Sequence, residues 1–110
     1  RIGATLVEDC GPCALTAARG ALEHKVSRAV VNAALAGHPP EGDLKMAFDF
    51  GQAIATQSPD AFAFGDAIEA KHGRAVRLEL AMTAAIVRAY PAMKRGLGLT
   101  KSCSITKLEI

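Results

Sequence analysis

The sequence predicts an all-α fold, a helical bundle of about five helices followed by a short extended C-terminal tail. Alanine occurs 22 times among 110 residues, and it has the highest helix propensity and is depleted in strands. Apolar residues in the C-terminal half recur at intervals of three and four, as on one face of a helix. The chain also lacks the alternating strand and helix patterns that α/β folds require.

Capping residues and helix breakers set the expected boundaries. Ser and Asp cap the first turn of a helix, Pro is tolerated within that turn, and Gly ends a helix. On these rules the first helix begins within Asp9–Pro12 and ends near His24, and the second runs from Arg28 to Ala36 with Ser27 as its cap. The third runs from Leu44 to about Thr56 with Asp43 as its cap. The fourth begins at Ser58-Pro59-Asp60 and ends at His72, before Gly73.

The last expected helix is apolar over most of its circumference. One face carries Leu78, Met82, Ala85, Ile86, Ala89 and Met93, and the opposite face carries Leu80, Ala81, Ala84 and Val87. Such a helix is covered on several sides, by the core or by another subunit. Pro91 is expected to kink this helix or end its regular part, Gly96 and Gly98 to terminate it, and the residues from Ser102 to form one extended arm.

Composition indicates a single domain over residues 1–110, and the chain is expected to lack N-terminal residues because it begins with Arg1. Half of the residues are apolar and 22% are charged, as in soluble globular proteins. No apolar run approaches the ~20 residues that span a bilayer, and a net charge of +2 without a basic cluster gives no sign of nucleic-acid binding. We therefore expect no membrane and no nucleic acid among the partners. Three cysteines do not make a secreted disulfide framework, which favours a cytoplasmic location.

The motif that carries chemistry is Cys10-Gly-Pro-Cys13, within "EDCGPCALTA". Residues i and i+3 of a helix have Cβ atoms ~5–6 Å apart, so a small closure would join the two sulfurs. A helix N-terminus also stabilises a thiolate. Cys10 and Cys13 are therefore the candidate catalytic residues, and Glu8 is a candidate for proton transfer or for helix capping.

These residues also permit uses other than redox chemistry. Both thiols could be inert core residues. A zinc site would need two further ligands, and Cys103 is the only remaining cysteine, so neither a metal nor a cofactor is expected. The histidines, His24, His38 and His72, stand near predicted helix ends and are expected to cap these ends or to be solvated.

Residues outside the motif carry a family resemblance. A helical chain whose CxxC opens a helix, followed by "VVNAALAGHPP", "LKMAFDFGQAIA" and "RLELAMTAAIVRAYPAMKRGLG", resembles the carboxymuconolactone decarboxylase superfamily in its alkylhydroperoxidase D-like branch. The resemblance covers about Leu6 to Leu97. It implies a helical homo-oligomer (dimer, trimer or hexamer) whose dithiol reduces a peroxide or exchanges a disulfide and is restored by a dithiol reductant protein. The family's proton relay would place a glutamate before Arg1 and a histidine at Ala17, where this chain has alanine.

The leading hypothesis is a CxxC dithiol redox protein. By the resemblance Cys13 attacks and Cys10 resolves, whereas a thioredoxin-like helix start would make Cys10 the nucleophile, and both assignments stay open. One alternative is a non-catalytic oligomeric domain with a vestigial dithiol, since Ala17 cannot move a proton. Another is a lactone decarboxylase-type enzyme of the same superfamily, with Glu8, Asp9 or a histidine as the acid or base. A thioredoxin fold is not expected, because strands are lacking and Asp9 replaces the usual aromatic residue.

Overall fold

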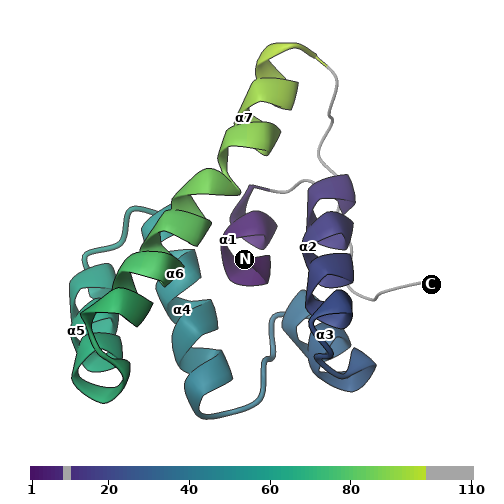
Figure 1. Ribbon diagram of the computed structural model, residues 1–110. Helices are drawn as coiled ribbons and strands as arrows, with labels where there is room; N and C mark the ends of the chain where they lie inside the picture. Colours follow the sequence, from purple (N-terminus) through teal and green to yellow (C-terminus); the bar gives the residue numbers. More distant parts are fainter. Residues whose placement is uncertain (9–10, 99–110) are drawn as a thin grey trace.

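The computed structural model describes residues 1–8 and 11–98, and every regular element in these ranges is a helix (Figure 1). The prediction of an all-α fold is therefore confirmed for this part of the chain. The tail expected from Ser102 lies outside the described residues. The helices are α1 (Ile2–Val7), α2 (Gly11–Glu23), α3 (Arg28–Leu35), α4 (Asp43–Ala55), α5 (Asp60–His72), α6 (Arg74–Ile86) and α7 (Ala89–Gly96).

Local capping explains where several helices begin. The Ser27 hydroxyl accepts a hydrogen bond from the Val30 backbone N–H at 3.3 Å, which confirms Ser27 as the N-cap of α3. The Ser58 hydroxyl accepts one from the Asp60 backbone N–H at 3.2 Å, at the start of α5. Asp43 is the first residue of α4 rather than its cap, where its negative charge still complements the helix dipole.

Two differences raise the number of described helices from the expected five to seven. Helix α1 was not predicted, because it is short and no side chain caps its N-terminus. The expected last helix is divided into α6 and α7 around Val87 and Arg88. Pro91 explains the division, since it has no N–H to donate to the carbonyl of Val87 four residues earlier, and its ring crowds that carbonyl.

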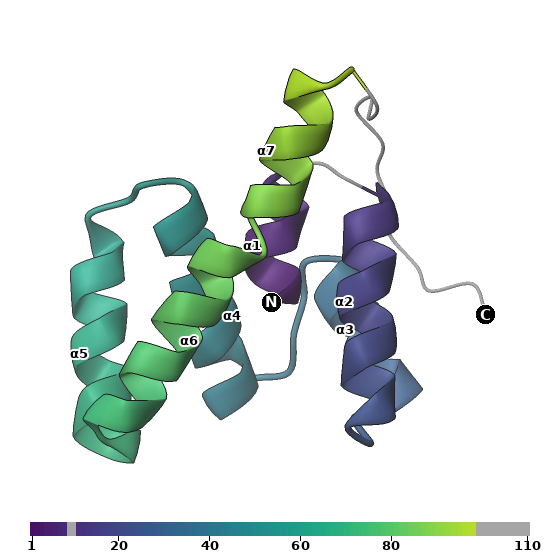
Figure 2. The same cartoon turned by 45° about the horizontal axis from the view of Figure 1, so that its top comes forward.

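The short helix α1 lies at the centre of the molecule, between α2 and α3 on one side and α4 on the other (Figures 1 and 2). Helices α4, α5 and α6 pack against one another beyond it. A Cβ atom at Gly3 would lie 2.6 Å from the backbone carbonyl oxygen of Phe48, so only glycine permits this approach of α1 to α4. Helix α1 is thus held tightly in place just before the CxxC segment.

Small side chains make up much of the core. One cluster of buried residues joins α2 to α3, and another joins α1, α4 and α6; they contain Ala14, Ala18, Val31 and Leu35, and Ala4, Ala55 and Ala84, respectively. Alanine lets helices approach closely while each residue buries little area. The many alanines that predicted helices therefore also set their spacing.

Helix α6 runs in front of α4, and α7 continues upward from it (Figures 1 and 2). Their inner side includes Ala84, which is 2% exposed. One of the two expected apolar faces points outward, with Leu78, Met82, Ile86 and Met93 all at least half exposed. None of the described helices combines the length and the apolarity needed to cross a bilayer.

Candidate functional site

Cys13 is the third residue of α2, and its side chain is half-buried. It lines a cavity of about 470 Å³ that is bounded by α1, α2 and the α6–α7 region. The lining residues are Arg1, Thr5, Pro12, Cys13, Thr16, Ile86, Val87, Tyr90 and Lys94. We refer to this space as the Cys13 cavity.

Cys13 takes part in a disulfide in this structure. The other two cysteines of the chain, Cys10 and Cys103, lie outside the described residues. The participation of Cys13 in a disulfide and its place beside a cavity distinguish it from a cysteine that only fills space in a core.

The Cys13 cavity is basic at its polar positions. Lys94 is half-buried in α7, and none of the described lining residues of this cavity is Asp or Glu. Cys13 also stands in the first turn of α2, where backbone N–H groups lack helical partners and carry partial positive charge. Both features favour the thiolate of a reduced cysteine over its thiol.

Glu8 lies at the C-terminal end of α1 in a cluster with two arginines, which we call the Glu8 clamp. Its Oε1 accepts a hydrogen bond from Nε of Arg88 at 2.7 Å, and its Oε2 accepts one from Nη2 of Arg95, also at 2.7 Å. Nη1 of Arg95 donates to the backbone carbonyl of Glu8 at 2.9 Å. The clamp therefore ties the end of α1 to α7 and to the residues that join α6 to α7.

The clamp keeps Glu8 ionised. Its side chain is only 7% exposed, and burial by itself raises the pKa of the carboxyl group. Hydrogen bonds from Arg88 and Arg95, together with their positive charges, outweigh burial and hold the pKa of Glu8 below its ordinary value of 4.5. At neutral pH Glu8 is a hydrogen-bond acceptor rather than a proton donor, and it does not line the Cys13 cavity.

The position of the expected relay histidine falls in another part of the molecule. Ala17 is 3% exposed and lines a second cavity, of about 340 Å³, together with His24. The Nδ1 atom of His24 lies 2.9 Å from the carbonyl oxygen of Gly20, which confirms that this histidine caps the end of α2. His72 lies at the end of α5, with Nε2 at 3.3 Å from Oδ1 of Asp43. No histidine is among the described lining residues of the Cys13 cavity.

Sequence reasoning missed the residues that α7 contributes. Lys94 and Tyr90 line the Cys13 cavity, and Arg88 and Arg95 hold Glu8. Arg88 and Arg95 are separated from Glu8 by 80 and 87 positions, so no local spacing could reveal these contacts. Among residues 1–8 and 11–98, no three His, Cys, Asp or Glu side chains gather to hold a metal ion.

Comparison with known proteins gave no matching family model, no similar curated protein and no similar solved structure.

Proposed function

We propose that the chain is a helical dithiol–disulfide oxidoreductase in which Cys10 and Cys13 interconvert between two thiols and a disulfide. The observation that carries the proposal is the position of Cys13, which is disulfide-bonded and lines an open cavity at the start of α2. The resemblance to alkylhydroperoxidase D-like proteins supports the same chemistry and implies the fold of that branch. A reducing compartment such as the cytoplasm would keep the dithiol ready for reaction.

The proposed reaction begins with the reduced protein. The Cys13 thiolate attacks one sulfur of a substrate disulfide in the cavity, forms a mixed disulfide and releases the other substrate sulfur as a thiolate. Cys10 then attacks the Cys13 sulfur as a thiolate and releases the second substrate thiolate. The substrate has gained two electrons, the protein holds a Cys10–Cys13 disulfide, and an external dithiol reductant restores the two thiols.

Disulfide exchange fits the cavity better than peroxide reduction does. A thiolate is a good leaving group, whereas the hydroxide or alkoxide released from a peroxide needs a proton in the transition state. Glu8 and Ala17 are both absent from the Cys13 cavity, and Glu8 is held ionised. Lys94 and Tyr90 are the groups in the cavity that could carry a proton, so peroxide turnover is expected to be the slower reaction.

The experiment measures turnover of a small disulfide and of a peroxide in separate reactions, each with excess dithiol reductant. Cys10→Ser and Cys13→Ser are expected to abolish disulfide turnover. Cys103→Ser is the matched control and should retain it. Equal turnover in the wild type and in Cys13→Ser would reject the proposal, and so would a loss caused by Cys103→Ser alone.

A second candidate function, an oligomer-forming domain, is favoured by the apolar stripe on α6 and α7. The stripe consists of Leu78, Met82, Ile86, Tyr90, Met93 and Leu97, which are 50–64% exposed and separated by three or four positions. The stripe runs from Leu78 in α6 to Leu97 at the C-terminal end of α7. Six such side chains form an apolar patch of roughly a few hundred Å², a size that is typical of interaction surfaces. We propose that the stripe binds a second copy of this chain. Two of its residues, Ile86 and Tyr90, also border the Cys13 cavity.

Sedimentation velocity tests the stripe. Met82→Glu is expected to dissociate the oligomer, because it places a charge in the middle of the apolar surface. Phe62→Glu is the control, since Phe62 is 73% exposed on α5 and outside the stripe. A wild-type monomer at all concentrations, or an oligomer that Met82→Glu leaves intact, would exclude self-association through this surface.

A further inference from the structure

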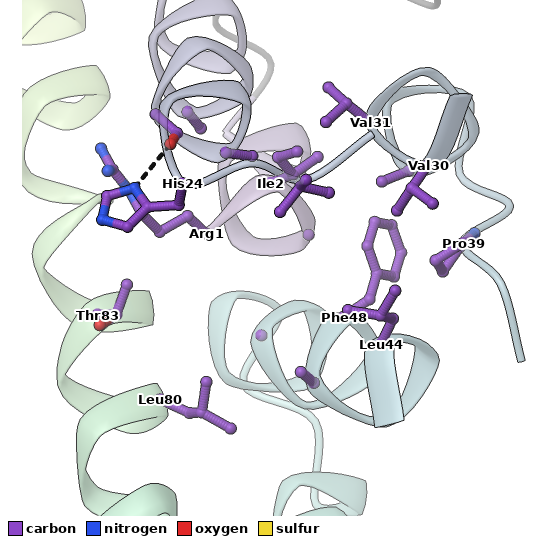
Figure 3. Close-up of a pocket in the computed structure, with 18 of the residues that line it drawn as sticks. Arg1, Ile2, His24, Val30, Val31, Pro39, Leu44, Phe48, Leu80 and Thr83 are labelled. Carbon is purple, nitrogen blue, oxygen red and sulfur yellow. Dashed lines mark hydrogen bonds between the residues drawn. The ribbon is translucent and has the colours of Figure 1, made fainter. Parts of the chain in front are cut away.

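The second cavity has an apolar body and one polar end, and Arg1 is the residue that it shares with the Cys13 cavity. Its volume of about 340 Å³ lies near the lower end of the ~300–1,000 Å³ typical of small-molecule sites. Figure 3 shows Arg1 and His24 side by side at one end, with Thr83 of α6 nearby. The remainder is mainly apolar, with Ile2, Val30, Val31, Pro39, Leu44 and Phe48 among the lining residues (Figure 3).

Burial differs between the two ends, although Leu44 of the apolar part is 51% exposed. Val31 and Phe48 are only 1% and 9% exposed, whereas Arg1 and His24 are exposed. A molecule in this cavity would therefore place an apolar body inside and a polar group at the mouth. Transfer of the apolar body out of water would supply most of its binding free energy.

The polar end is basic and anchored to α2. The Nη1 atom of Arg1 would lie 3.3 Å from a Cβ atom placed on Gly20, so the guanidinium is close to the α2 backbone. The carbonyl oxygen of Gly20 lies 2.9 Å from Nδ1 of His24, which holds the imidazole beside Arg1 (Figure 3). None of the described residues that line this cavity is Asp or Glu, so its lining supplies no carboxylate to neutralise Arg1.

From this charge and shape we infer that the second cavity binds a small apolar monocarboxylate. The planar guanidinium of Arg1 can donate two parallel hydrogen bonds to a carboxylate, which an alcohol cannot accept with the same strength. An ammonium group at the same position would face Arg1 with like charge. Binding is independent of the dithiol chemistry, because Cys13 does not line this cavity.

Isothermal titration with three probes of equal chain length tests the ligand class. Octanoate is expected to bind about tenfold or more tightly than octanol, the difference that one charge-assisted hydrogen bond supplies. Octylammonium is expected to bind most weakly. Equal affinity for octanoate and octanol, tighter binding of octylammonium, or no binding of any probe would overturn the inference.

Variants locate the binding. Arg1→Gln should weaken octanoate binding about tenfold and leave octanol binding unchanged. Lys25→Gln is the matched control, since Lys25 is an exposed neighbour of His24 that does not line the cavity. An Arg1→Gln variant that binds octanoate like the wild type would contradict the role of the guanidinium.

Two filling variants test whether the apolar body is the binding site. Val30→Phe on α3 and Ala47→Leu on α4 each enlarge a half-buried lining side chain, and both should abolish octanoate and octanol binding. Circular dichroism identifies which variant is folded. A folded filling variant that binds octanoate normally would place the ligand elsewhere, whereas Cys13→Ser should bind octanoate like the wild type whether or not the dithiol is catalytic.

Discussion

The Glu8 clamp makes the strongest prediction about stability. Glu8→Gln keeps the shape of the side chain but removes the charge that Arg88 and Arg95 share. It also replaces one carboxylate oxygen with an NH₂ group that faces an arginine donor. A hydrogen bond to a charged group contributes ~1.5–3 kcal/mol. The two arginines are 34% and 48% exposed and can be partly rehydrated, so we expect a loss of about 2–3 kcal/mol in total.

Urea unfolding followed by far-UV circular dichroism measures this loss of unfolding free energy. Thermal unfolding of the same variant should show a decrease in Tm of about 10 °C for a chain of this size. Asp66→Asn is the control, because Asp66 pairs with Arg77 at 2.8 Å but is 75% exposed. That substitution should change stability by less than about 1 kcal/mol. Equal losses for Glu8→Gln and Asp66→Asn would refute the reasoning that burial makes the clamp strong.

The same clamp predicts how stability depends on pH. The folded-state pKa of Glu8 is lowered by its two arginines, so the folded state binds the Glu8 proton less readily than the unfolded state does. This contribution is fully present above the ordinary value of 4.5 and is lost as the pH falls through the lowered folded-state value. The difference in unfolding free energy between the wild type and Glu8→Gln should therefore shrink in acid. A difference that stays constant as the pH is lowered from 7 would contradict the lowered pKa.

Three further predictions concern other positions. Lys94→Gln should slow alkylation of the reduced Cys13 by about two- to fivefold, the effect of one nearby half-buried charge, and an unchanged rate would remove Lys94 from the site. Ala17→His should not increase peroxide turnover, because Ala17 lines the second cavity, and a gain in turnover would show that this position communicates with the dithiol. Gly3→Ala should destabilise the fold by about 1–3 kcal/mol, since its Cβ would lie 2.6 Å from a backbone oxygen of α4. Gly96→Ala, which meets no atom within 4 Å, should instead be neutral or stabilising in the same unfolding measurement.

Local chemistry in the sequence was sufficient to predict most helix boundaries. Ser27, Ser58 and Gly73 mark ends that depend on residues a few positions away, and the structure has helix boundaries at these places. Helix α1 escaped prediction because its six residues are held mainly by packing on α4, which local propensity does not report. The sequence left open whether the core or another subunit covers the stripe, since periodicity identifies an apolar face without stating what covers it.

In the site, too, residues that nearby sequence identifies differ from residues that only the fold brings into place. Cys13 could be recognised from its spacing to Cys10 and from the first turn of a helix. Lys94, Arg88 and Arg95 could not, because they reach the N-terminal region only through the path of α6 and α7. The pairing of Glu8 with two arginines also changes its expected role from proton transfer to holding α7 beside the Cys13 cavity.

The proposed dithiol cycle is tested most directly by mass spectrometry of the reduced protein after reaction with one equivalent of a small disulfide. We predict that each chain loses two hydrogens, that two substrate thiols are released, and that peptide mapping finds the new disulfide between Cys10 and Cys13. A stable adduct on one cysteine, or a disulfide that joins Cys13 to Cys103, would contradict the cycle.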